Sequence, residues 1–92
     1  MVKEVVKRDG SHEPFNAEKI KKSIAMAAHE AGLDEPKTQE LVGRISAAAI
    51  QFANAKEVIS TSALKYKILS DLDTVNPAVS KAWRTYEAAR RK

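Results

Sequence analysis

The chain has 92 residues, no cysteine and a formal net charge of +4 at pH 7. This length suits one small domain with a single core, and the lack of cysteine excludes disulfides, thiolate metal sites and thiol nucleophiles. Hydrophobic residues make up 43% and aromatic residues only 5%, which predicts a core of aliphatic side chains. No apolar run approaches the roughly 20 residues that span a bilayer, and no signal peptide is evident, so we expect a cytoplasmic protein that does not insert into a membrane.

The first 15 residues predict a β-hairpin. A strand-like run at residues 4–7 precedes Asp9-Gly10, a pair that favours a two-residue hairpin turn because glycine tolerates positive φ. Residues 12–15 can return as a second strand. Asn16 follows at the position where a side chain can cap a helix.

Two helices are predicted after the hairpin. Apolar residues at helical spacing predict the first over residues 17–31, and Gly32 is a natural stop after it. The second begins at residues 34–36, where a proline and two acids suit the first turn of a helix, and it continues to about Ala53.

The rest of the chain predicts a short strand and two further helices. Residues 58–59 can form the strand, and residues 60–61 can cap the third helix. Residues 73–77 are expected to form a loop that ends at Pro77, the first residue of the fourth helix. We therefore predict an α+β fold in which a four-helix bundle is capped by a small N-terminal hairpin, with residues 58–59 as its third strand. Residues 1–92 are expected to form one domain.

Catalytic machinery is not evident in the sequence. The three glycines are isolated, so both the P-loop and the dinucleotide-binding fingerprint are absent. The hydroxyls at residues 60–62 are better explained as helix caps than as nucleophiles, because no histidine lies nearby in sequence. His12 and His29 are far apart and lack carboxylates at ligand spacing, so we expect neither an enzyme nor a metal site.

Anion binding is better supported. Lys7 and Arg8 end the first strand, and Lys19 lies in the first turn of the first helix. If the short third strand joins the hairpin, Thr61 and Lys65 come beside Lys7 and Arg8, so that cations, a hydroxyl and a helix N-terminus surround one spot. Such a spot suits a phosphate chain, and a solvated basic rim is the alternative.

Several of these segments resemble a known family. Residues 5–10 (VVKRDG), 13–16 (EPFN) and 19–20 (KI) are similar to the opening motif of the ATP-cone, the regulatory nucleotide-binding domain of many ribonucleotide reductases and of a reductase-operon repressor. Residues 59–64 (ISTSAL) resemble the family's second motif, and the resemblance extends over about residues 3–91. The closing pattern of aromatic and basic residues is similar to Trp83, Tyr86, Arg90 and Arg91.

The resemblance implies a regulatory domain that binds ATP or dATP and has no catalytic activity of its own. The phosphate contacts that it implies are Lys7, Arg8, Lys19, Thr61, Lys65 and Arg90. The adenine or ribose contacts that it implies are Val5, Glu13, Phe15, Asn16, Ile20 and Ile24. Glu87 departs from the family pattern, in which many members have arginine after the aromatic residue equivalent to Tyr86. Mg²⁺ is expected as the companion of the triphosphate.

The partners and two alternative functions stay open. A reductase subunit or another regulated protein is the expected partner, homo-oligomers are allowed, and the chain is either a stand-alone cone or one taken from a larger protein. A small basic DNA-binding protein would need exposed aromatic residues among its cations, but we predict that Trp83 and Tyr86 lie in the core. The second alternative is an assembly domain that is indifferent to nucleotide.

Overall fold

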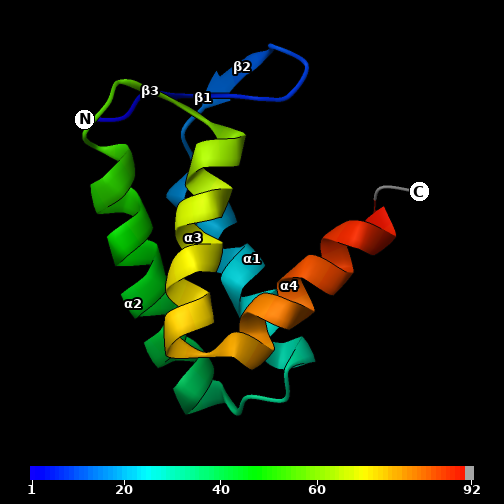
Figure 1. Cartoon of the computed structure of the whole chain (residues 1–92). Coiled ribbons are helices and arrows are strands. Elements are labelled where there is room, and N and C mark those ends of the chain that lie inside the picture. Colours follow the sequence, from blue (N-terminus) through cyan, green and yellow to red (C-terminus); the bar gives the residue numbers. More distant parts are fainter. Residues whose placement is uncertain (91–92) are drawn as a thin grey trace.

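Four helices form a bundle, and a small sheet lies over one end of it (Figure 1). The computed structural model describes residues 1–90, with side chains through residue 89. In chain order the elements are β1 (Glu4–Val6), β2 (His12–Pro14), α1 (Ala17–Glu30), α2 (Glu35–Ala53), β3 (Val58–Ser60), α3 (Thr61–Val75) and α4 (Pro77–Arg90). This arrangement confirms the predicted α+β fold.

The sheet has the strand order β2-β1-β3. In the central strand, Val5 lies opposite Glu13 of the antiparallel β2 and opposite Ile59 of the parallel β3. Val5 and Ile59 are buried, because alternate residues of a strand point to opposite faces and these two face the bundle. The prediction that residues 58–59 join the hairpin is thus confirmed, and the sheet brings the start of α3 beside the end of β1.

The hairpin turn differs from the predicted two-residue turn. Three residues, Arg8, Asp9 and Gly10, lie between Lys7 and Ser11, whose backbone N–H and carbonyl are joined at 2.8 Å. Of these three residues only Gly10 has positive φ, at 86°. The Asp9 carboxylate instead accepts hydrogen bonds from the Ser11 amide at 2.9 Å and hydroxyl at 2.6 Å, which lower the pKa of Asp9. A two-residue type I′ turn needs positive φ at both central residues, and Asp9 does not supply it.

The predicted helix caps are present. The side chain of Asn16 accepts from the amide of Glu18 at 3.0 Å at the start of α1, and the hydroxyl of Ser60 accepts from the amide of Ala63 at 3.0 Å at the start of α3. Gly32 ends the turn after α1 with φ of 88°. These local contacts fix where α1 and α3 begin, directly beneath the sheet.

The connection between α3 and α4 is shorter than predicted. Residues 73–75 are helical, so the prediction of a loop there is wrong and Asn76 alone links the two helices. The reason is a tertiary contact: Asp73 accepts hydrogen bonds from the Ser80 hydroxyl at 2.6 Å and from Arg84 at 2.8 and 3.0 Å. The bonds from Arg84 and Ser80 hold the pKa of Asp73 at about 2.

The core runs along the bundle axis and consists mostly of aliphatic residues. Ile24, Ile45, Leu72 and Val79 come from four different helices and are 0–1% exposed. Trp83 is half-buried against this core, whereas Tyr86 is 46% exposed. The prediction that Tyr86 lies in the core is therefore wrong, because α4 leans away from the other helices toward its C-terminal end (Figure 1). No helix within residues 1–90 is long and apolar enough to cross a membrane.

Candidate functional site

Two of the predicted phosphate-binding lysines meet at one carboxylate. Glu13 of β2 lies 3.2 Å from the ammonium of Lys7 and 3.7 Å from that of Lys19. The lysine side chains are 51% and 68% exposed, so water reaches both ion pairs. Exposed pairs of this kind are weak, and an anion of higher charge can replace the carboxylate.

A groove of about 220 Å³ continues from Lys19 along the start of α3. Four of the predicted site residues line it, namely Lys19, Ile20, Thr61 and Lys65. The remaining lining residues are Ser23, Leu64, Ile68, Trp83 and Glu87. The groove therefore combines two cations and the N-terminal turn of α3 with an apolar floor, a combination that suits a phosphorylated ligand with a flat apolar part.

Thr61 connects the groove to the sheet. It is the first residue of α3, and its hydroxyl donates to the backbone carbonyl of Val6 at 3.1 Å. Because a hydroxyl has one proton, Thr61 can donate to a phosphate oxygen only if it gives up this bond. The contact also holds the start of α3 beside Lys7, the next residue after Val6.

Lys65 is held by a carboxylate from the opposite wall of the groove. Its ammonium lies 2.8 Å from one oxygen of Glu87, and the other oxygen of Glu87 accepts the indole N–H of Trp83 at 3.2 Å. The two charged side chains are 28% and 29% exposed, and Lys65 is more shielded from water than Lys7 and Lys19 are. Glu87 and Trp83 were not among the predicted site residues.

The two remaining predicted phosphate-binding cations are Arg8 and Arg90. Arg8 lies at the exposed hairpin turn, and its side chain has no hydrogen bond or ion pair with the part of the chain that the structure describes. The side chain of Arg90 lies outside the described residues.

Most of the residues predicted to hold adenine or ribose belong to the core or to a cap. Val5, Ile20 and Ile24 are buried, and Phe15 packs against the core in a half-buried position. The side chain of Asn16 caps α1 by accepting a hydrogen bond from the amide of Glu18. Ile20 borders the groove, but Ile24 has no exposed surface, so a base could reach Ile24 only after its neighbours move. These contacts stay predictions.

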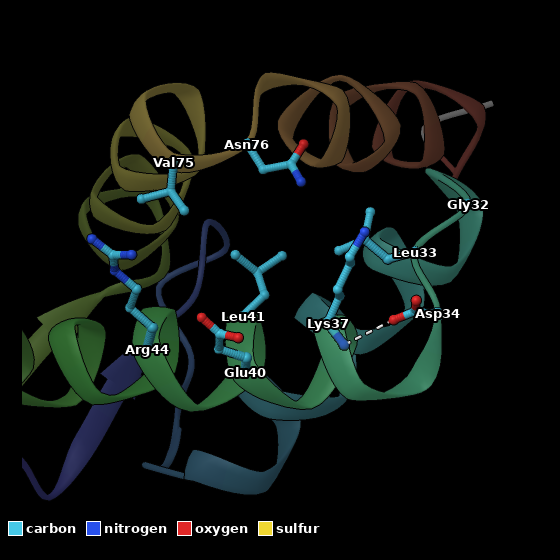
Figure 2. A pocket seen from close by; sticks show the side chains of 9 residues that line it. All are labelled: Gly32, Leu33, Asp34, Lys37, Glu40, Leu41, Arg44, Val75 and Asn76. Carbon is cyan, nitrogen blue, oxygen red and sulfur yellow. Dashed lines mark hydrogen bonds between the residues drawn. The ribbon is translucent and has the colours of Figure 1, made fainter.

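A larger hollow, of about 450 Å³, lies at the opposite end of the bundle (Figure 2). Its charged residues are Asp34, Lys37, Glu40 and Arg44, all of them in or beside α2. Figure 2 shows Asn76 of the α3–α4 corner facing them across the hollow, and its dashed line is the bond from the Lys37 amide to the Asp34 carboxylate. Two acids balance two bases here, so this end attracts a phosphate chain less than the sheet end does.

The possible metal ligands among the described residues are histidine and carboxylate side chains. Within residues 1–90, no three histidine, aspartate or glutamate side chains gather in a way that could hold a metal ion. The two histidines each face a single carboxylate, His12 at Glu4 and His29 at Glu35, both at 3.4 Å.

Sequence reasoning missed the role of Glu87 as the partner of Lys65. The two residues are 22 positions apart, and only the packing of α4 against α3 brings them together. The spacing of Trp83 and Glu87, four residues apart on one helix, was the available signal that both side chains share a face.

The chain matches one family model over nearly all of its length. A family model described as the ATP cone domain matches residues 3–92, which is nearly the entire chain. This match covers the hairpin, the groove and all four helices. The chain therefore belongs to the ATP-cone family, whose members are nucleotide-binding regulatory domains.

Proposed function

We propose that residues 1–92 act as one ATP-cone domain that binds ATP or dATP at the sheet end of the bundle and thereby regulates another protein. The main support is the convergence of three lysines from separate segments at this end. Lys7 follows β1, Lys19 lies in the first turn of α1, and Lys65 lies one turn after the start of α3. Each is held by a carboxylate that a phosphate group could replace. The apolar floor of the groove offers a surface for the base.

The expected affinity follows from the number of contacts. A charge-assisted hydrogen bond contributes roughly 1.5–3 kcal/mol. Three or four of them can therefore approach the roughly 8 kcal/mol that corresponds to a micromolar dissociation constant. Mg²⁺ would arrive with the triphosphate, and phosphate oxygens and water would supply most of its ligands.

Regulation requires that the bound and empty states differ. Phosphates that take Lys7 and Lys19 from Glu13 would change the contacts between the hairpin and α1. The regulated partner would bind these two arrangements with different affinity. A reductase subunit, another regulated protein or a second copy of the chain could serve as this partner in the cytoplasm.

The proposed nucleotide site is a binding site without catalytic activity. Within the described part of the groove, no histidine or unpaired carboxylate lies where it could activate a water molecule. We therefore expect negligible ATPase activity, measured as phosphate release from purified protein. Steady phosphate release that disappears in Lys7→Ala would contradict this expectation.

Calorimetric titration with ATP, dATP and GTP in the presence of Mg²⁺ tests the proposal. We expect micromolar binding of adenine nucleotides that weakens at least tenfold in Lys7→Ala and in Lys19→Ala, since each variant removes one charge-assisted contact. Lys37→Ala, which removes an equal charge at the opposite hollow, is the matched control and should bind as the wild type does. Binding by the wild type that Lys37→Ala alone abolishes would contradict a nucleotide site at the sheet end.

Nucleic-acid binding is the second candidate, and one observation favours it. Tyr66 is 76% exposed and lies between two lysines, Lys65 and Lys67, as in surfaces that stack on bases. Both lysines, however, are already paired with carboxylates, which reduces the positive potential there. Salt-dependent binding of single-stranded DNA without any nucleotide would favour this second function.

A further inference from the structure

Helices α3 and α4 are joined at two places that differ in character. At the corner, where only Asn76 separates them, Asp73 binds both Ser80 and Arg84 of α4. From this corner the two helices diverge toward the C-terminal end of α4 (Figure 1). The second junction lies near that open end, where Lys65 of the first turns of α3 meets Glu87 of the last turn of α4.

The pair at the open end is short and partly shielded from water. Its ammonium and carboxylate are 2.8 Å apart, with under a third of each side chain exposed. Trp83 donates its indole N–H to the second carboxylate oxygen at 3.2 Å, which fixes the orientation of Glu87. Lys65, Glu87 and Trp83 all border the groove that contains Lys19 and Thr61.

We propose that Glu87 competes with the nucleotide phosphates for Lys65, so that nucleotide binding releases the C-terminal end of α4. This inference rests on the proposed nucleotide site. The ammonium of Lys65 ties the carboxylate of Glu87 to α3, and phosphate oxygens in the groove would need the same ammonium. Since the carboxylate and the phosphates repel each other, binding of one at this ammonium weakens binding of the other.

The competition gives the domain its two states. In the empty state the pair Lys65–Glu87 ties α4 to α3, and in the bound state that tie is lost while the corner contacts of Asp73 persist. Because α4 stays fixed at its start, the change is confined to its end, where the exposed side of Tyr86 can meet a partner surface. The position of the last turn of α4 would thus differ between the empty state and the nucleotide-bound state.

Charge removal at Glu87 provides the first test. Glu87→Gln keeps the size of the side chain and an acceptor for Trp83 but lacks the competing charge. We therefore expect MgATP to bind to Glu87→Gln about fivefold more tightly than to the wild type. Asp71→Asn is the matched control. It removes the same charge from another lysine pair of α3, Lys67–Asp71, and should change the affinity by less than about twofold. Unchanged or weaker binding by Glu87→Gln would overturn the inference.

A double-mutant cycle separates competition from general charge repulsion. If Glu87 acts through Lys65, the gain from Glu87→Gln should shrink when Lys65 is replaced as well, in Lys65→Met/Glu87→Gln compared with Lys65→Met. An equal or larger gain in the Lys65→Met background would overturn the competition. If the wild type and Asp71→Asn bind MgATP and Glu87→Gln binds it with the same affinity, this inference alone is rejected. If no folded variant binds MgATP, the nucleotide site and this inference are rejected together.

Trp83 is a probe of the release, because it is the only tryptophan in the chain and its indole N–H is bonded to Glu87. Its indole N–H resonance should shift when the wild type is saturated with MgATP, since Glu87 then leaves Lys65 and its bond with the indole is altered. The same titration of Asp71→Asn should give the wild-type shift. An indole resonance that stays in place at saturation would overturn the release.

Discussion

The two ends of the bundle use charged side chains in different ways. At the α3–α4 corner, Arg84 donates hydrogen bonds from two nitrogens to the carboxylate of Asp73, and Ser80 donates a third hydrogen bond to the same carboxylate. At the sheet end, single ammonium groups contact single carboxylates, and Glu13 is shared between Lys7 and Lys19. A forked contact fixes geometry, whereas single lysine contacts can be exchanged for a ligand. The corner therefore has the contacts of a structural junction, and the opposite end of the bundle has those expected of the proposed nucleotide site.

Leu72→Ala should destabilise both ends of the bundle together and have the largest effect on the free energy of unfolding. Leu72 has no exposed surface and packs in the core that the two ends share, so its truncation leaves a cavity. We expect the free energy of unfolding to fall by about 2–5 kcal/mol in urea denaturation. A loss below about 1 kcal/mol would show that the core can collapse around the smaller side chain.

Gly10→Ala should affect the sheet end alone. Gly10 has φ of 86°, and an L-residue is strained at this φ even though no atom lies within 4 Å of the position that the new methyl group would take. We expect a loss of about 1–2 kcal/mol in stability and weaker binding of nucleotide, because the turn positions Lys7 and Arg8. Gly43→Ala is the matched control, since Gly43 lies inside α2 with open space around it and alanine favours a helix. Equal stability of Gly10→Ala and the wild type would contradict the strain.

Thr38→Val should stabilise the bundle without any change at the site. Thr38 is fully buried in α2, and its hydroxyl is the one buried side-chain oxygen or nitrogen without a partner among the described residues. Valine has nearly the same shape and no polar group to desolvate, so we expect a gain of about 1 kcal/mol in thermal or urea unfolding. Destabilisation by this substitution would show that the hydroxyl has a bonding partner in solution, such as a water molecule.

Asp73→Asn should affect the corner alone, with the smallest and most pH-dependent effect. The pKa of Asp73 is lowered to about 2 in the folded chain from an ordinary value of 3.8, so its ionised form favours folding above pH 3.8. This contribution is lost as the pH falls from 3.8 through about 2. We expect Asp73→Asn to have a lower Tm than the wild type at neutral pH, and the difference to narrow as the pH falls through this range. A difference that is constant over the range would contradict an electrostatic origin.

Local signals allowed most of the fold to be predicted. Asn16, Ser60 and Gly32 act on residues close to them in sequence, so their roles as caps and stop could be predicted without tertiary structure. The helical state of residues 73–75 could not be predicted this way, because Asp, Thr and Val are weak helix formers and the contact of Asp73 with Arg84 overrides that preference. Tyr86 was misplaced because helical spacing does not reveal where a helix leaves its neighbours.

The candidate site was predictable in part. The expectation that residues 58–59 join the hairpin implied that Thr61 and Lys65 lie near the end of the first strand, and for Thr61 the hydrogen bond to Val6 agrees with it. The carboxylate that holds Lys65 could not be assigned, because Glu87 reaches it only through the packing of α4 on α3. For Glu13 the sequence indicates a contact with the base or ribose, with an ion pair to a neighbouring lysine as the alternative, and in the structure Glu13 lies between Lys7 and Lys19. Their part in binding stays a prediction.

An amide NMR titration of the labelled chain with MgATP would show at which end of the bundle the nucleotide binds. Binding at the sheet end predicts that the resonances of Gly10, Thr61 and Lys65 shift at micromolar nucleotide, while those of Gly32 and Asn76 at the far hollow stay in place. The two ends lie in the same molecule, so each is a control for the other. Shifts confined to Gly32, Asn76 and their neighbours, or no shifts at millimolar MgATP, would contradict the account.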